Sequence, residues 1–314
     1  ALYGAAEAGR DYNTTDMSHI RMYNEYFPPY KAAIDAGAGS IMASFNEIDG
    51  VPATANKWLL TEVLRNQWGF KGFVVSDYTG VSEMIAHGIG DLQTVSARAL
   101  DAGLDMDMVS EGLLTTLKKS VDEGKITEQQ ITEACRRVLK AKFQLGLFDD
   151  PYRYCSEERA KSEVFTATNR AEARKAATES FVLLKNDNVL PLKKSGTIAV
   201  IGPMANTREN MTGTWSVAAR FSESISVMDG LTKAVGNSAK LVYARGSNLH
   251  EDAAIEERAT MFGKSLNRDK RAAEEMRSEA VRIARAADVI VAVVGEGAEM
   301  SGEASSVTNL ELPQ

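Results

Sequence analysis

The sequence predicts an α/β protein with parallel sheets, divided into two domains. Three apolar runs in the first half begin near residues 40, 73 and 105, and each follows a helical stretch. Their starts lie 33 and 32 residues apart (73 − 40 and 105 − 73), which is the length of one strand–helix unit. Consecutive units of this kind form a parallel sheet. The 314 residues leave room for two domains of ordinary size.

Each unit in the first half has its own local signals. The helices before the first and third runs end at Gly37 and Gly103, because glycine readily takes the left-handed conformation that ends a helix. The helix before the second run is Trp58–Arg65, whose apolar residues recur every three to four positions. The three predicted strands are Ser40–Ser44, Gly72–Ser76 and Asp105–Val109.

Two more helices are predicted before the pattern breaks. They cover Leu113–Val121 and Thr127–Lys142, and the second is opened by a capping box between Thr127 and Gln130. A polar, charged tract follows and predicts a linker over residues 151–175. We therefore expect a first domain over residues 1–150 and a second over residues 176–314.

The second domain shows α/β patterning with a different period. Thr197–Ile201 and Leu241–Tyr243 are predicted strands, and a helix over Glu279–Ala287 leads into the apolar run Val289–Val294. The charged tract over residues 251–278 is expected to be a solvated helical excursion. A complete (β/α)₈ barrel takes about 250 residues, so the first domain is either an open sheet or part of a larger protein.

Composition excludes several classes of protein. The 36 Lys and Arg against 43 Asp and Glu give a net charge of −7, which disfavours nucleic-acid or anionic-membrane partners. No run approaches the roughly 20 apolar residues of a membrane helix. Cys135 and Cys155 are the only cysteines and the three histidines are scattered, so we expect neither a disulfide scaffold nor a His- or Cys-based metal centre.

Acidic residues at strand ends are the first candidates for chemistry. Asp77 ends the strand over residues 73–76, and ligands of parallel α/β sheets bind where the strands end. It is either a nucleophile, with Tyr78 as an aromatic wall for a sugar or another ring substrate, or the cap of a following helix. Asp105 and Asp107 end the third strand, and a structural role is favoured for both.

A second candidate region follows the run that ends at Val294. The segment Gly295–Ser306 carries Glu296, Glu299 and Glu303 among glycines, which suits an acidic loop over a cleft or an exposed acidic loop. A phosphate-binding loop is disfavoured because these glutamates would repel phosphate and no lysine follows. Trp215 lies in a polar segment and is either a loop anchor or a stacking surface.

Four longer motifs are specific enough to compare with known families. They are Ser44-Phe-Asn-Glu-Ile-Asp-Gly-Val-Pro52, Trp68-Gly-Phe-Lys-Gly-Phe-Val-Val-Ser-Asp-Tyr78, Gly146-Leu-Phe-Asp-Asp-Pro-Tyr152 and Phe181-Val-Leu-Leu-Lys-Asn186. Together they resemble the bacterial, periplasmic-type β-glucosidases of glycoside hydrolase family 3. The resemblance implies the C-terminal part of a (β/α)₈ TIM-type barrel followed by the first part of an α/β sandwich domain. It also implies an internal fragment of a longer enzyme, which alone is expected to be poorly active or inactive.

The same resemblance implies a retaining mechanism with two carboxylates from different domains. Asp77 matches the nucleophile in the family's Ser-Asp-aromatic motif. Glu303, in Ser301-Gly-Glu-Ala-Ser-Ser306, matches the acid/base residue, with the nearby Glu299 as the alternative. The two expected residues are 226 positions apart (303 − 77), so docking of the two domains would be needed to bring them together.

Sugar-binding residues are implied in the same way. Tyr78 and Phe45 match aromatic positions that line the first sugar site, and Trp215 looks like the tryptophan beside the second. The chain departs from the family at two of its positions: Phe45 stands where many members have tyrosine, and Val307 where relatives often have arginine.

The resemblance thus implies an exo-acting β-glycosidase that removes terminal, non-reducing β-D-glucosyl residues. A β-xylosidase or exo-glucanase of the same family is the alternative, and a catalytically inactive carbohydrate-binding fragment is the rival from another class. The expected partner is an oligosaccharide or β-glucoside substrate, with neither metal nor organic cofactor. A periplasmic or secreted location is expected, and the oligomeric state stays open.

Overall fold

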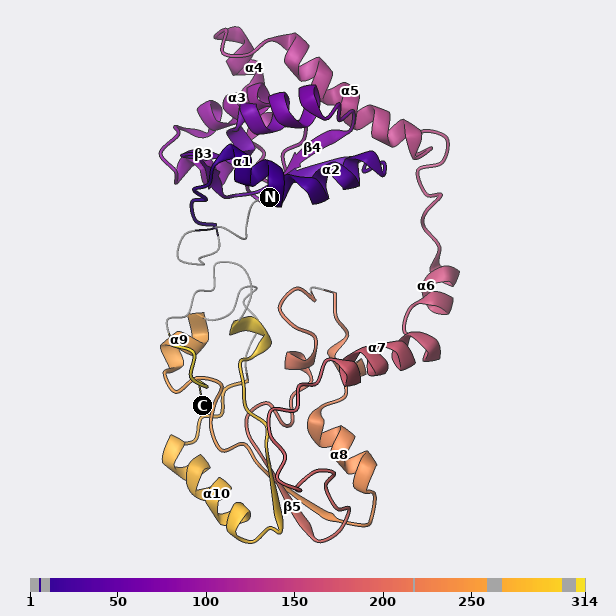
Figure 1. Ribbon diagram of the computed structural model, residues 1–314, viewed down its shortest axis with the longest axis vertical. Coiled ribbons are helices and arrows are strands. Elements are labelled where there is room, and N and C mark those ends of the chain that lie inside the picture. Colours follow the sequence, from indigo (N-terminus) through magenta and orange to yellow (C-terminus); the bar gives the residue numbers. More distant parts are fainter. Residues whose placement is uncertain (1–5, 7–11, 217, 259–266, 301–308, 314) are drawn as a thin grey trace. The chain divides into compact units, whose positions relative to one another are not determined.

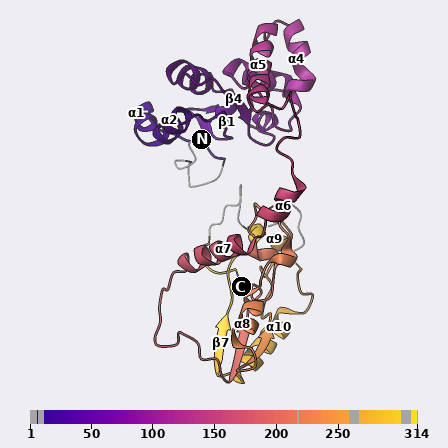
Figure 2. The same ribbon diagram turned by 90° about the vertical axis from the view of Figure 1, so that its right-hand side faces the viewer.

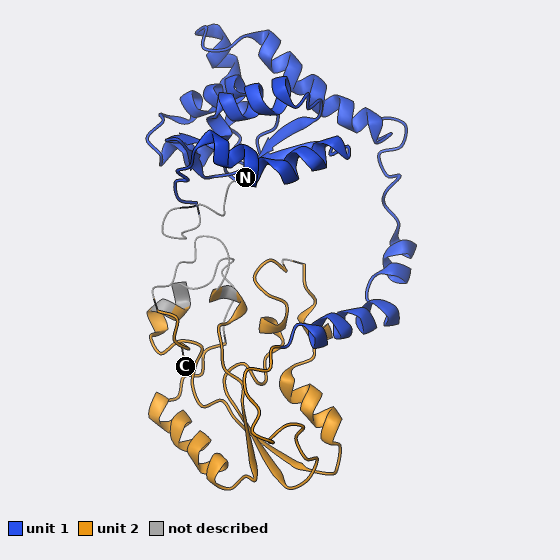
Figure 3. Cartoon of the chain, in the orientation of Figure 1, with its two compact units in different colours: residues 1–181 blue, residues 182–314 orange. Residues whose placement is uncertain are grey.

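The computed structural model describes residues 6, 12–216, 218–258, 267–300 and 309–313. The chain divides into two compact units, unit 1 over residues 1–181 and unit 2 over residues 182–314 (Figure 3). Both combine helices with parallel strands, so the mixed α/β class is confirmed.

Unit 1 begins with short helices and then alternates strands with helices (Figure 1). Its strands are β1 (Ser40–Ala43), β2 (Glu47–Ile48), β3 (Val51–Pro52) and β4 (Phe73–Ser76). Its α-helices are α1 (His19–Arg21), α2 (Phe27–Asp35), α3 (Leu92–Ala102), α4 (Gly112–Asp122), α5 (Glu128–Gln144), α6 (Glu157–Glu163) and α7 (Ala167–Glu179). Helical turns of other kinds are η3 (Met22–Tyr26) and η5 (Trp58–Gln67), which are π-helical, and η4 (Ala53–Ala55) and η6 (Ser82–Ile85), which are 3₁₀.

The predicted parallel pairing is confirmed for the first two apolar runs. Strands β1 and β4 lie side by side in parallel, with Ala43 opposite Ser76 at their carboxyl ends. The third predicted strand is wrong, because only Met106 forms an isolated parallel bridge, to Val75. The carboxylates on either side of Met106 bond to other elements, and Val109 has a φ of 72°, so the extended backbone does not continue.

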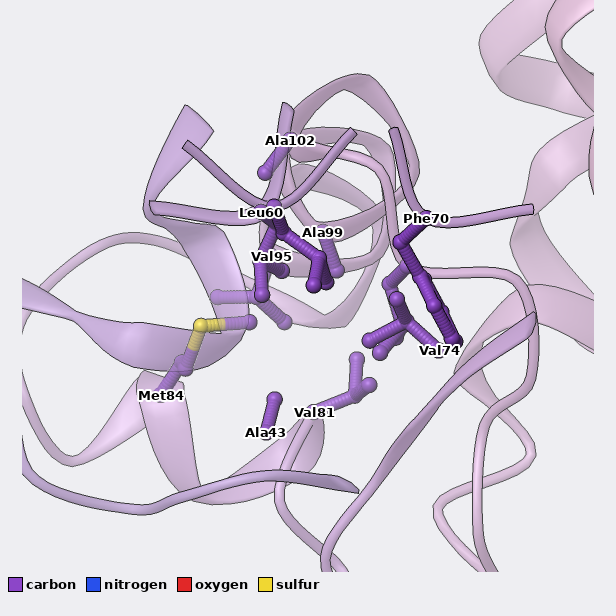
Figure 4. Close-up of a cluster of buried hydrophobic side chains, with 11 residues drawn as sticks. Ala43, Leu60, Phe70, Val74, Val81, Met84, Val95, Ala99 and Ala102 are labelled. Carbon is purple, nitrogen blue, oxygen red and sulfur yellow. The ribbon is translucent and has the colours of Figure 1, made fainter. Parts of the chain in front are cut away.

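One buried cluster joins these strands to the helices between them. Side chains from β1, η5, β4 and α3 gather in it (Figure 4). Its members are Ala43, Leu60, Leu64, Phe70, Val74, Val81, Met84, Val95, Ala99, Ala102 and Leu104. Because β1 and β4 are packed into this cluster, the loops that leave their carboxyl ends start from fixed positions.

The end of unit 1 differs in part from expectation. Helix α5 follows Thr127 and keeps both hydrogen bonds of the capping box with Gln130, as predicted. The tract expected to be a linker contains α6 and most of α7, which begin after the capping side chains of Ser156 and Thr166. Neither helix buries a residue, so caps and local propensity, not packing, account for them.

Unit 2 contains a three-stranded parallel sheet in the order β6–β5–β7. Its strands are β5 (Thr197–Ile201), β6 (Lys240–Ala244) and β7 (Val289–Ala292), and its α-helices are α8 (Val227–Val235), α9 (Ala253–Arg258) and α10 (Ala273–Arg285). The 3₁₀ turns are η7 (Glu209–Met211), η8 (Phe221–Glu223) and η9 (Ala298–Met300). All three strands occur where apolar runs predicted them. Helix α10 begins six residues before the predicted start (279 − 273), with Glu274 and Glu275 in its first turn.

The two faces of this sheet pack against different helices (Figures 1 and 2). Ile198 and Val200 point to one side and join a cluster with Val235 of α8. Ala199, between them, points to the other side, where its neighbours include Ala244 and Ala280 of α10. Successive residues of a strand face opposite sides of the sheet. The face toward α8 therefore carries large side chains such as Ile198 and Val200. The face toward α10 carries the small Ala199 and Ala244 beside the larger Ile201 and Val242.

Candidate active site

Asp77 directly follows β4, at the edge where β1 and β4 both end. Its Oδ1 accepts a hydrogen bond from the backbone N of Tyr78 at 2.7 Å, and its backbone O accepts one from Gly80 N at 3.0 Å. The next helical turn, η6, begins at Ser82 and its N-cap is Val81. The alternative that Asp77 caps the following helix is therefore wrong, and its carboxylate lies at the strand end.

The backbone on both sides of Asp77 is fixed by hydrogen bonds to residues 106–108. The fully buried Ser76 accepts a bond at its Oγ from Met108 N at 2.8 Å and donates one to Asp77 O at 2.9 Å. On the other side, Thr79 N donates to Met108 O at 2.9 Å. A carboxylate on such a backbone is held in place before any ligand binds, which is what an efficient nucleophile needs.

Thr79 has a strained backbone conformation. Its φ is 60°, in the left-handed region that β-branched residues rarely adopt. Its Oγ1 donates to Tyr78 O and contacts Glu83 Oε1 at 2.6 Å. A strained backbone conformation of this kind persists only where surrounding contacts hold it in place. Such conformations are concentrated at functional sites.

The two aromatic candidates of unit 1 differ in exposure. Tyr78 is 60% exposed, whereas Phe45 is buried and its ring meets that of Tyr12 edge-on at a centroid distance of 4.5 Å. Phe45 follows β1 and Tyr78 follows β4, and the two strands end in register. Both side chains thus belong to the loops at the same edge of the sheet as Asp77.

Asp105 and Asp107 have structural roles, as favoured from the sequence. The Asp105 side chain is only 1% exposed. Its Oδ2 accepts hydrogen bonds from Arg65 Nη2 at 2.5 Å and from Val74 N at 2.8 Å. Its Oδ1 accepts a hydrogen bond from Arg137 Nη1 at 2.7 Å. Burial lowers the pKa of the Arg65 guanidinium, and the adjacent Asp105 opposes that shift. Asp107 Oδ2 instead accepts from the first backbone N–H groups of α4.

In unit 2, the loop that carries Trp215 is tied to the start of the acidic loop after β7. Trp215 is 56% exposed, and the adjacent Thr214 is buried and donates through Oγ1 to Ala298 O. Asn210 Oδ1 accepts from Ala298 N at 2.8 Å. Neither of these two tethering side chains stood out in the sequence, since each bond joins residues more than 80 positions apart.

The expected acid/base residues are only partly covered by the structure. Glu303 and Val307 lie outside the described residues, and Glu299 belongs to η9, which begins at the tethered Ala298. Over the residues that are described, no group of three or more His, Cys, Asp or Glu side chains could hold a metal ion. Within the same ranges, no helix combines the length and apolar character needed to cross a membrane.

Both halves of the chain match models of known protein families. Residues 2–141 match the glycosyl hydrolase family 3 N-terminal domain, and residues 181–314 match the glycosyl hydrolase family 3 C-terminal domain. The chain belongs to glycosyl hydrolase family 3. The resemblance inferred from the four motifs is therefore confirmed.

Two known proteins are similar to this chain over 95% or more of its length. A periplasmic β-glucosidase of Salmonella typhimurium is 44% identical over 100% of this chain and 42% of its own length. A β-xylosidase of Formosa agariphila is 35% identical over 95% of this chain and 40% of its own. The chain thus spans about two-fifths of the length of these relatives.

Solved structures of a β-glucosidase are similar in fold to this chain. The crystal structure of a β-glucosidase from Listeria innocua in complex with glucose covers 100% of this chain at 37% identity and a TM-score of 0.80, over 40% of its own length. A mutant of that enzyme in complex with laminaribiose matches at 36% identity and the same TM-score.

Proposed function

We propose that the protein is a retaining, exo-acting β-glycosidase that removes terminal, non-reducing β-D-glucosyl residues, with Asp77 as its nucleophile. The observation that carries the proposal is the Asp77 carboxylate itself, held at the carboxyl end of β4 by a backbone bonded to Met108 and not used as a helix cap. Similarity to β-glucosidases, one of them bound to glucose, supports the substrate class.

The reaction would proceed in two displacements. In the first, the Asp77 carboxylate attacks the anomeric carbon, the glycosidic C–O bond breaks, and an acid proton passes to the leaving oxygen. In the second, the deprotonated acid takes a proton from water, and the resulting hydroxide attacks the glycosyl–Asp77 ester and frees the carboxylate. We assign the acid/base role to Glu303, with Glu299 as the alternative.

The proposal extends to the sugar sites and the domains. Tyr78 and Phe45 would line the first sugar site and Trp215 the second. The parallel order β1, β4, Met106, which follows the chain with helices between, supports an incomplete (β/α)₈ barrel over residues 1–150. Residues 151–175 would connect it to an α/β sandwich domain over residues 176–314.

A covalent trap tests this function. The full-length polypeptide that contains these residues is incubated with an activated 2-deoxy-2-fluoro-β-glucoside, digested, and analysed by mass spectrometry. We expect one fluoroglucosyl adduct, on Asp77, together with loss of activity toward an aryl β-glucoside. An adduct on another carboxylate would contradict the assignment of Asp77. Saturable sugar binding with neither adduct nor turnover would favour the inactive carbohydrate-binding alternative.

A β-xylosidase is the second candidate, because one of the similar proteins carries that name. Glucosides differ from xylosides by one hydroxymethyl group, and a difference of that size changes kcat/KM by about 10–200-fold. The ratio of kcat/KM for the two aryl glycosides decides between them. We expect the glucoside to be preferred.

The exposed ring of Trp215 gives a prediction for the second sugar site. Trp215→Ala should raise the KM for a β-linked glucose disaccharide about tenfold, because a stacking surface for the second sugar is lost. β-Glucosyl fluoride has no second sugar, so its KM should change little. Trp215→Phe is the matched control and should retain most of the affinity. Equal effects of Trp215→Ala on both substrates would contradict this role.

We also propose a periplasmic location. It rests on the name of the Salmonella typhimurium relative. Fractionation of the source cells should recover the protein with periplasmic markers, and recovery with cytoplasmic markers would contradict the proposal.

A further inference from the structure

The loop that follows β1 ends in a small hairpin whose first residue is Glu47. Strands β2 and β3 pair in antiparallel register, with Glu47 opposite Pro52. The connecting residues Asp49 and Gly50 have φ values of 54° and 73°, as a two-residue hairpin turn requires. Phe45, a candidate for the first sugar site, lies two residues before this hairpin. An isolated two-stranded hairpin is only marginally stable, so its position depends on what holds it.

The Glu47 carboxylate joins three segments that are far apart in the sequence. Its Oε1 lies 2.7 Å from Nδ1 of His87, and its Oε2 accepts a hydrogen bond from Thr14 Oγ1 at 3.0 Å. The Glu47 and His87 side chains are 23% and 26% exposed, so both are partly buried. Both carboxylate oxygens are therefore engaged, each by a different segment.

The backbone around Glu47 strengthens the contact with residues 13–15. Glu47 O accepts from Thr15 N at 2.8 Å and Thr15 Oγ1 at 2.9 Å, and Asn46 Nδ2 donates to Asn13 O at 2.7 Å. On its other side, the hairpin is bonded through Glu47 to His87. His87 follows η6, which in turn follows the Asp77 loop. The Glu47–His87 contact therefore links the loop of Phe45 to the segment that leaves Asp77.

We propose that Glu47 is a positioning residue, which through His87 holds the loop of Phe45 in place beside the loop of Asp77. The proposal rests on the proposed function, since it concerns the placement of the first sugar against the nucleophile. It does not require Glu47 to touch the substrate. Displacement of a reacting group by about 1 Å can cost about 100-fold in rate, so a small shift of this loop is sufficient.

The test compares five variants of the full-length polypeptide with the unmodified protein, using an aryl β-glucoside. We expect Glu47→Ala and His87→Ala each to lower kcat/KM at least about tenfold, and the double variant to lose no more than either single one, because the two residues act as one unit. Glu47→Gln keeps the length and an acceptor oxygen, so it should stay within about threefold. Lys57→Ala, which breaks the exposed Lys57–Asp101 ion pair, is the control and should leave kcat/KM unchanged.

Amide hydrogen exchange gives a second readout that needs no substrate. Glu47→Ala and His87→Ala should both speed exchange over residues 44–52 and leave β5 of unit 2 unaffected. Faster exchange with unchanged kcat and KM would mean a purely structural contact and would overturn the positioning role.

These experiments distinguish a failure of the proposed function from a failure of the positioning role of Glu47. In the first case the unmodified protein would neither hydrolyse β-glycosides nor form an adduct on Asp77, and the positioning role would fall with it. If the unmodified protein is active and labelled on Asp77 while the Glu47 and His87 variants keep full kcat/KM, only the positioning role is overturned.

Discussion

Asp77→Asn is expected to reduce the hydrolysis of aryl β-glucosides by at least about 10⁴-fold in kcat, the scale seen when a catalytic nucleophile is removed from other hydrolases. The amide is a poor nucleophile, so no glycosyl–enzyme ester forms. The backbone bonds around Asp77 come from Ser76 and Thr79, so the substituted chain should keep its fold. The measurement is kcat by initial rates, with circular dichroism to confirm folding.

Two further variants sharpen this prediction. Asp107→Asn makes the same change at a neighbouring carboxylate that only caps α4, and it should cost about 1 kcal/mol of stability with little loss of kcat. Asp77→Gly leaves space for azide, which should attack the anomeric carbon as the phenolate leaves, giving the α-glucosyl azide. Full activity of Asp77→Asn, or a β-azide from Asp77→Gly, would be incompatible with the assigned role.

Asp105→Ala is expected to destabilise unit 1 by about 3–5 kcal/mol, because it leaves two guanidinium groups without their counter-charge. Asp105 is the common partner of Arg65 and Arg137, and it also accepts the backbone N–H of Val74 in β4. All these contacts are lost together. The free energy is measured by denaturant unfolding, and hydrogen exchange at the β4 amides assigns the effect to unit 1.

The control for Asp105 is an ion pair on the surface. Asp122→Asn removes the partner of Lys118 on the exposed side of α4, and it should change stability by no more than about 0.5 kcal/mol. If Asp105→Ala unfolded at the same denaturant concentration as Asp122→Asn, the buried pair would contribute no more than the exposed one, against this prediction.

Much of the fold could be predicted from local sequence. The runs that became β1, β4 and β5 are continuous and apolar, as buried parallel strands are. The run after Gly103 does not form the predicted strand. Its residue Asp105 forms ion pairs with Arg65 and Arg137, and no local sequence pattern reveals these contacts. The tract of α6 and α7 was expected to be a linker because of its polarity, yet capping alone suffices for short helices.

The residues of the candidate site also differ in whether the local sequence predicts them. Asp77 could be located from the sequence, because a carboxylate after a buried run lies at the ligand-binding end of a parallel sheet. Glu47 and His87 could not, since their contact joins residues 40 positions apart and neither lies in a periodic pattern. The assignment of Glu303 stays a prediction that rests on the family motif, because that residue lies outside the described ranges.

The two faces of the unit 2 sheet differ in the size of the side chains that meet the helices, and this difference affects which substitutions each face can accept. Opposite α8, an aliphatic side chain can be exchanged for another of similar volume with modest repacking. Opposite α10, where Ala199, Ala244 and Ala280 meet, any larger side chain would have to push the helix away from a close-packed interior. Divergence and engineering of this half therefore have more room opposite α8 than at these three alanines beside α10.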